Sequence, residues 1–122
     1  MSYAKEIEDL HQFFQDYFSG KLPAEAIERF INTLDTEFAL VNASGNTADR
    51  HTIIDAIRQA HAQRPDIKIW IEQPHLRHES GDLLVATYEE WQTLAGKTTQ
   101  RQSTVIFERD ETLPNGLRWL HV

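Results

Sequence analysis

The hydrophobic pattern of this 122-residue chain changes its period once, at Pro65, and that change limits the possible folds more than any other feature. Before Pro65, apolar residues recur at steps of three and four, which is typical of helices that bury one face. After Pro65, apolar and polar residues alternate, which is typical of strands. We therefore predict one α+β domain over residues 1–122, with helices on one face of an antiparallel sheet.

The first helix is predicted over residues 3–18, between a capping Ser2 and a terminating Gly20. One face of this helix is apolar and is expected to pack on the sheet. The opposite face is polar and is expected to be solvated, with Glu6 and His11 among its members.

A second helix follows Pro23, and a third is predicted from a cap at Thr47 or Asp49 to about Gln63. A short strand over residues 37–42 lies between these two helices. The rest of the chain is predicted to form four strands joined in sequence by hairpins, over residues 67–78, 83–93, 99–109 and 117–122.

The two faces of the sheet can be assigned from the turns. Side chains alternate between faces along a strand, and paired residues on neighbouring strands share a face. Symmetric turns at Ser80-Gly81 and Ala95-Gly96 set the pairing. The face expected beneath the helices then includes His75, Leu84, Ala86, Tyr88, Glu90, Arg101, Ser103, Val105, Phe107, Leu120 and Val122.

All three tryptophans, Trp70, Trp91 and Trp119, are predicted on the other face. Three indoles on one open sheet face indicate a covered surface. We expect a second copy of the chain to cover it in a two-fold homodimer. The alternative is that the indoles lie flat on a hydrated sheet, shielded by long polar neighbours.

A candidate site lies at the polar end of the helix-covered face. Glu90 is predicted opposite Arg101, and Tyr88 opposite Ser103. If this end is half-buried, Arg101 could bind a ligand carboxylate and Glu90 could act as a base beside two hydroxyls. The alternative is a cross-strand ion pair in solvent. Tyr17, on the first helix, either seals the sheet or turns its hydroxyl into the cavity.

No strong catalytic or cofactor motif is present in the sequence. His75 and His78 are three positions apart on one strand, so they are expected to point to opposite faces and not to share a metal ion. We predict no metal and no cofactor.

The charge balance and the cysteine content limit the partners and the compartment. Twelve Lys and Arg residues against nineteen Asp and Glu residues give a net charge of −7. This argues against nucleic acid or an anionic membrane as a partner, because both require a positive surface. The absence of cysteine excludes disulfides and thiol catalysis, and favours a reducing compartment, the cytoplasm.

Several segments carry a family resemblance. They are Gln73-Pro74-His75-Leu76, Ser80-Gly81-Asp82, Val85-Ala86-Thr87-Tyr88, the run from Thr104 to Asp110, and Arg118-Trp119-Leu120-His121-Val122. Together with the order of the predicted elements, they make the chain resemble the nuclear transport factor 2-like superfamily. Within it, the chain is most similar to the SnoaL-like branch, near the association domain of calcium/calmodulin-dependent protein kinase.

The resemblance implies a cystatin-like cone, in which a curved antiparallel sheet wraps around the N-terminal helices. It also implies a pocket between the concave sheet and the helices, and dimerisation through the outer face of the sheet. In the kinase association domain a pocket arginine lies on the strand that matches residues 85–93, and the matching position here is Glu90. The acid set of the ketosteroid isomerase-like members does not map onto this chain.

Three functions are compatible with these patterns. The first is a homodimer that binds a small organic molecule with one polar or acidic group, at Tyr17, Tyr88, Glu90, Arg101 and Ser103. The second is a cofactor-free isomerase, cyclase or dehydratase in which Glu90 moves a proton and Tyr88 stabilises charge on oxygen. The third is an assembly module without a ligand. The pKa of Glu90 discriminates between the first two, because a base needs a raised pKa and an ion pair lowers it.

Overall fold

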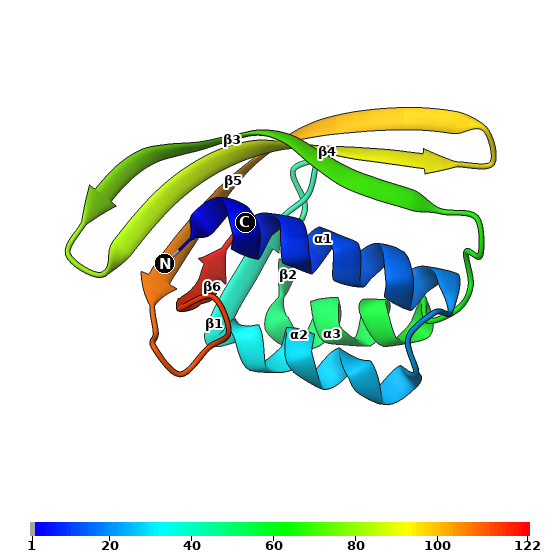
Figure 1. Ribbon diagram of the computed structural model, residues 1–122, viewed down its shortest axis with the longest axis horizontal. Coiled ribbons are helices and arrows are strands. Elements are labelled where there is room, and N and C mark those ends of the chain that lie inside the picture. Colours follow the sequence, from blue (N-terminus) through cyan, green and yellow to red (C-terminus); the bar gives the residue numbers. More distant parts are fainter. Residues whose placement is uncertain (1) are drawn as a thin grey trace.

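The computed structural model describes residues 2–122, which form three α-helices, one 3-10 turn and a six-stranded sheet (Figure 1). In chain order the elements are α1 (Tyr3–Ser19), η1 (Ala24–Ala26), α2 (Ile27–Thr33), β1 (Leu34–Val41), β2 (Thr47–Asp49), α3 (Arg50–Gln59), β3 (Lys68–Ser80), β4 (Leu83–Leu94), β5 (Lys97–Arg109) and β6 (Leu117–His121). The long strands β3, β4 and β5 curve over α1, and α2 and α3 lie beyond α1 in the same view. The predicted α+β class, with a curved sheet around N-terminal helices, is confirmed. None of the helices in this part of the chain is long and apolar enough to cross a bilayer.

Helix α1 begins and ends where the sequence predicts. The Ser2 hydroxyl accepts a hydrogen bond from the backbone N–H of Lys5 at 3.1 Å. Gly20 ends the helix with a φ of 88°, a left-handed conformation that glycine adopts at little cost. The prediction for the polar face is wrong at two positions, because Glu6 and His11 are only 1% and 2% exposed. Each has polar partners inside the fold.

Glu6 is the centre of a buried cluster that joins α1 to α2 and β6. Its carboxylate accepts hydrogen bonds from Trp119 Nε1 at 2.6 Å, Arg29 Nη2 at 3.2 Å and Asn115 Nδ2 at 2.9 Å. A buried carboxylate is costly unless it is paired and hydrogen-bonded. These three donors come from three separate segments, so the cluster fixes the start of α1 against the sheet.

The strand order of the sheet is β2-β1-β6-β5-β4-β3. Strand β1 runs parallel to β6, and the other neighbouring strands are antiparallel. Strand β2 is not predicted from the sequence, and β1 begins at Leu34, three residues before the predicted start at residue 37. Helix α3 is capped by Asp49, whose Oδ1 accepts from the Thr52 N–H at 2.9 Å, and it ends at Gln59, before the predicted Gln63.

The predicted pairing of β4 with β5 is confirmed along both strands, so Glu90 lies opposite Arg101 and Tyr88 opposite Ser103. The pairing of β3 with β4 agrees with the prediction only as far as Glu72. Beyond that point two irregularities shift the register, and Gln73 adopts a φ of 54°. Such bulges add a residue to one strand and reverse the faces that follow.

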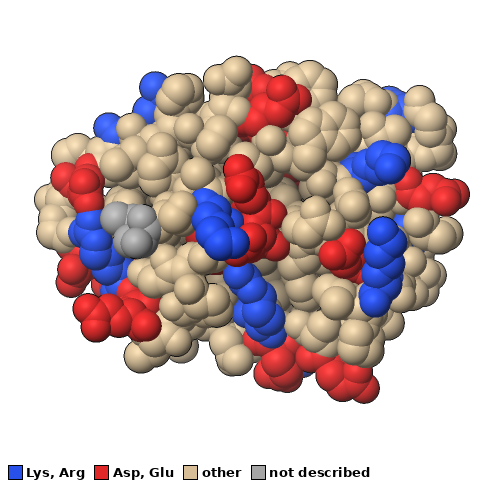
Figure 2. All heavy atoms as spheres, viewed as in Figure 1, with Lys and Arg blue, Asp and Glu red and all other residues tan. Residues whose placement is uncertain are grey.

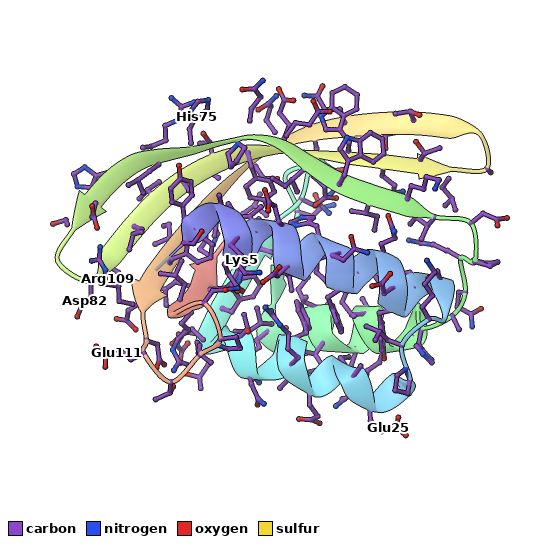
Figure 3. All side chains as sticks on the ribbon, viewed as in Figure 1. Lys5, Glu25, His75, Asp82, Arg109 and Glu111 are labelled. Carbon is purple, nitrogen blue, oxygen red and sulfur yellow. The ribbon has the colours of Figure 1, made fainter. Side chains whose placement is uncertain are left out.

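The shift places His75 on the outer face, whereas the sequence predicted the helix-covered face. His75 lies opposite Thr87, and Figure 3 shows it pointing away from the helices. His78 lies opposite Val85, on the same outer face, so the prediction that the two histidines point to opposite faces is also wrong. Within residues 2–122 no three His, Cys, Asp or Glu side chains are grouped so that they could hold a metal ion.

The register of β6 against β5 places Trp119 in the core instead of on the outer face. Phe107 lies opposite Trp119, but the neighbouring Ile106 lies opposite His121, which leaves Leu120 as the extra residue. Trp119 is 1% exposed, and its ring lies 4.7 Å from that of Phe107. The predictions of Trp119 as an interface residue and of Leu120 as a helix-covered one are therefore wrong.

Candidate functional site

A cavity of about 190 Å³ lies between α1, α2, α3 and the concave face of the sheet. Most of its lining is apolar, and much of that is aromatic. Phe14, Phe18, Phe30, Phe38 and Trp119 supply rings, and Leu10, Ile53 and Ile57 are among the aliphatic contacts. The polar lining consists of His11, Tyr88, Glu90 and Gln92. The buried face of α1 and the inward-pointing side chains of β4, which alternate with outward-pointing ones, meet in this interior space.

His11 and Glu90 form the polar centre of this cavity. His11 Nε2 lies 2.9 Å from Glu90 Oε1, and His11 Nδ1 lies 2.8 Å from the backbone oxygen of Ile7. A carbonyl oxygen can only accept, so Nδ1 carries a proton and donates it to Ile7. When Glu90 is ionised, Nε2 is therefore also a donor, and the ring and the carboxylate form a charge-assisted pair.

The environment of Glu90 decides its protonation state. Burial raises the pKa of Glu90, but the hydrogen bond from His11 and the charges of His11 and Arg101 outweigh burial, so the pKa lies below its usual value. The predicted pairing with Arg101 is thus a minor part of the effect, since Arg101 Nε lies 3.8 Å from Glu90 Oε2. The stronger partner, His11, was missed from the sequence. A lowered pKa does not favour Glu90 as a general base at neutral pH.

Stability in acid is expected to depend on Glu90. Because its pKa is lower in the folded protein than in the unfolded chain, this carboxylate contributes stability that is present above the unfolded value of about 4.3. That contribution is lost as the pH falls through the lower folded value. Urea unfolding should therefore lose more free energy between about pH 5 and about pH 3 in wild type than in Glu90→Gln. Equal losses in the two proteins would contradict the lowered pKa.

Tyr88 is buried between His11 and the strand partner Ser103. The rings of Tyr88 and His11 meet edge to face, with centroids 5.3 Å apart. Burial and the neighbouring Glu90 carboxylate raise the pKa of Tyr88 far above its ordinary value, against smaller opposing effects of Ser103 and Arg101. Tyr88 is therefore a neutral hydroxyl at the polar centre of the cavity.

Arg101 and Ser103 do not line the cavity but an adjoining groove of about 130 Å³ beside the end of β1, which we call the outer groove. The Arg101 side chain is 51% exposed. Glu90, Leu40 and Val122 line both the groove and the cavity, so they form the wall between the two. Of the five predicted ligand-binding residues, Tyr88 and Glu90 line the cavity. Arg101 and Ser103 lie on the other side of this wall, in the groove.

Tyr17, the fifth predicted residue, does not line the cavity. Its hydroxyl donates to the backbone oxygen of Ala24 at 3.4 Å, and its ring packs 4.5 Å from that of His61. Of the two alternatives weighed for this residue, the structure supports the sealing role. Its prediction as a cavity contact is wrong.

On the outer face, Trp70 and Trp91 stack with ring centroids 6.0 Å apart. Their indole N–H groups donate to Glu72 and Glu89 at 3.0 and 3.1 Å. Trp70 is 37% exposed. The predicted outer-face position of these two residues is therefore correct, while their contact with a second copy stays a prediction.

Comparison with known families identifies the family of this chain. Residues 3–122 match the family model described as sucrose-6-phosphate phosphohydrolase C-terminal. The chain belongs to this family. No curated protein sequence matches this member of the sucrose-6-phosphate phosphohydrolase C-terminal family.

Solved structures share the fold of this family member. An NTF2-like protein of unknown function from Pseudomonas aeruginosa is 27% identical, over 98% of this chain and 93% of its own, with a TM-score of 0.89. The association domain of C. elegans CaMKII, a calcium/calmodulin-dependent protein kinase, is 16% identical over 97% and 91%, with a TM-score of 0.61. An uncharacterised protein with a cystatin-like fold from Caulobacter vibrioides is 19% identical over 89% and 78%, with a TM-score of 0.60. The predicted nuclear transport factor 2-like fold is confirmed, and the SnoaL-like branch stays a prediction.

Proposed function

We propose that this protein binds a small, largely apolar organic molecule in the cavity between the concave sheet and the helices. The observation that carries the proposal is the cavity, with its volume of about 190 Å³. An apolar cavity of roughly 150 Å³ is enough to bind benzene. A ring-lined space with a few adjacent polar groups is also the usual form of a ligand site. Tyr88 and Glu90 would contact the ligand, together with His11.

Binding is favoured here over the alternative of a cofactor-free isomerase, cyclase or dehydratase. That reaction would use Glu90 as the base and Tyr88 to stabilise charge on oxygen. The lowered pKa of Glu90 argues against the first role, because it reduces the affinity of this carboxylate for a substrate proton. An assembly module alone has no use for the cavity.

The family description names a phosphohydrolase, but a phosphate ester is a poor match for this cavity. The charged groups in the lining are His11 and Glu90, and they neutralise each other. Arg101, which could pair with phosphate, lies in the outer groove. Figure 2 shows basic side chains lying beside acidic ones over the face that it presents, without an extended basic patch. We therefore favour an uncharged ligand, in a cytoplasmic protein as the cysteine-free sequence suggests.

We further propose that the protein is a homodimer through the outer sheet face. The stacked Trp70–Trp91 pair and the exposed Leu83 supply apolar area there. A charge at the centre of such an interface is strongly unfavourable. Trp91→Glu is therefore expected to halve the mass measured by light scattering, whereas Leu76→Glu, at an exposed residue of β3 on the helix-covered face, should leave it unchanged. An unchanged mass for Trp91→Glu would reject this interface.

Binding itself is tested with a library of small uncharged ring compounds and backbone amide NMR spectra. Ligands of the cavity should shift the amides of Leu10 to Phe14 in α1 and of Tyr88 to Gln92 in β4, because both segments contribute residues to its lining. A library that leaves both segments unshifted would reject the proposed function.

A further inference from the structure

The lining of the cavity limits the shape of a ligand. Rings from α1, α2, β1 and β6 surround it, and those of α1 and α2 already make stacked and edge-to-face contacts. Phe14 lies 5.7 Å from Phe18, 5.4 Å from Phe30 and 5.6 Å from His11, measured between ring centroids. A further ring can join such contacts favourably. The volume of about 190 Å³ suits one ring, or two small fused rings.

The polar centre limits the chemistry of that ring. An ionised carboxylate is an acceptor only, with about four lone-pair positions on its two oxygens. In Glu90, His11 uses one of these at 2.9 Å, and Arg101 approaches another only to 3.8 Å. Glu90 therefore retains acceptor capacity on a group that lines the cavity. A ligand group beside it is stabilised if it donates a hydrogen bond.

The same carboxylate disfavours acidic ligands. A ligand carboxylate in the cavity would be poorly hydrated and would find no free cation among the described lining residues, because the His11 ring is already paired with Glu90 at 2.9 Å and the Glu90 carboxylate lies close by. Arg101 could compensate only from outside the wall, where it is half exposed to water. The net charge of −7 adds repulsion at longer range.

We infer that the cavity selects an uncharged aromatic molecule of one ring or two small fused rings that donates a hydrogen bond to Glu90, in the manner of a phenol, and rejects aromatic carboxylates. This rests on the proposed function and narrows it. The sequence had left a polar or an acidic ligand group open. The cavity makes Glu90 the specificity-determining residue in place of Arg101.

Three probes of similar shape test the inference: phenol, toluene and benzoate. Phenol and toluene differ by a hydroxyl in place of a methyl group, so their affinities isolate the hydrogen bond. Hydrogen bonds to charged groups correspond to roughly tenfold or more in affinity. Titrations followed by the amide shifts of the cavity residues should therefore give phenol at least about a tenfold advantage in affinity over toluene, with no benzoate binding in the cavity.

In the Glu90→Gln variant, the advantage of phenol over toluene should fall to a few-fold at most. Glu89→Gln, the same change at the next residue but on the outer face, should behave as wild type.

The outcomes separate the two proposals. Equal affinities for phenol and toluene, or benzoate bound in the cavity as tightly as phenol, would overturn the ligand class while leaving cavity binding intact. If none of the three probes shifts the cavity amides, the proposed function fails and this inference fails with it. If Glu90→Gln does not fold, the three affinities in wild type and in Glu89→Gln still decide the result.

Discussion

Replacing Glu6 by alanine should lower the free energy of unfolding by about 3 kcal/mol. The carboxylate is 1% exposed and accepts from Trp119, Arg29 and Asn115. Without it, the buried indole N–H of Trp119 has no acceptor, and Arg29 loses its partner although one of its nitrogens is already buried and unpaired. Arg29 is 29% exposed and can turn partly to water, so the lower end of the range for a broken buried pair applies.

Two matched variants identify the cause of this loss. Glu6→Gln keeps the shape and an acceptor but removes the charge, so it should cost clearly less than Glu6→Ala. Glu8→Ala, on the exposed side of the same helix, should stay within about 0.5 kcal/mol of wild type. Urea unfolding measures all three. A Glu6→Ala protein as stable as Glu8→Ala would show that the cluster does not hold α1 against the sheet.

Replacing Leu40 by tryptophan should weaken ligand binding at least about tenfold, which corresponds to about 1.4 kcal/mol. Leu40 lines both the cavity and the outer groove, so a larger side chain there occupies either the binding space or its wall near Glu90. A bound ligand would then overlap the space that the tryptophan occupies, and overpacking of this kind costs about 1–3 kcal/mol of binding free energy.

The control for this variant makes the same change at Leu83, an exposed residue of β4 away from the cavity. Leu83→Trp should bind phenol as wild type does. Isothermal titration measures the affinities, and the melting temperature of each protein shows whether it is folded. Undiminished binding by a folded Leu40→Trp protein would place the ligand elsewhere.

Much of the fold could be predicted because local signals and tertiary packing agree. The cap at Ser2, the stop at Gly20 and the tight turn between β4 and β5 act over a few residues. The alternation of β4 and β5 then placed Tyr88 and Glu90 on the helix-covered face.

The buried polar residues of α1 could have been predicted from spacing but not from residue type. His11 stands between Ile7, Phe14 and Phe18 at the same steps of four and three that define the apolar stripe. Glu6 holds the equivalent place between Tyr3 and Leu10. We expected solvent at both positions because charged and polar residues are usually exposed. Only their long-range partners, Glu90 and Trp119, make burial favourable.

The errors on the sheet have a different origin. His75 follows a bulge near Gln73, and Trp119 directly precedes one at Leu120. One extra residue reverses the assignment of faces on its two sides, so a single alternation carried through it gives wrong faces. Pro74 is a residue type that indicates an irregular or edge position in β3, because proline cannot donate to the strand ladder. No residue type marks the extra position at Leu120. On α1, the prediction of Tyr17 as a ligand contact is wrong because its hydroxyl reaches the Ala24 carbonyl instead.

The central claim, that the space between α1 and the concave sheet is a binding site, is tested most directly by intermolecular NOEs between phenol and the wild-type protein. We predict NOEs from the phenol ring to Leu10 and Ile53, which contact the cavity from the two helices that flank it. Phenol NOEs confined to Trp70 and Trp91 on the outer face, or the absence of any NOE to the cavity at saturating phenol, would contradict it.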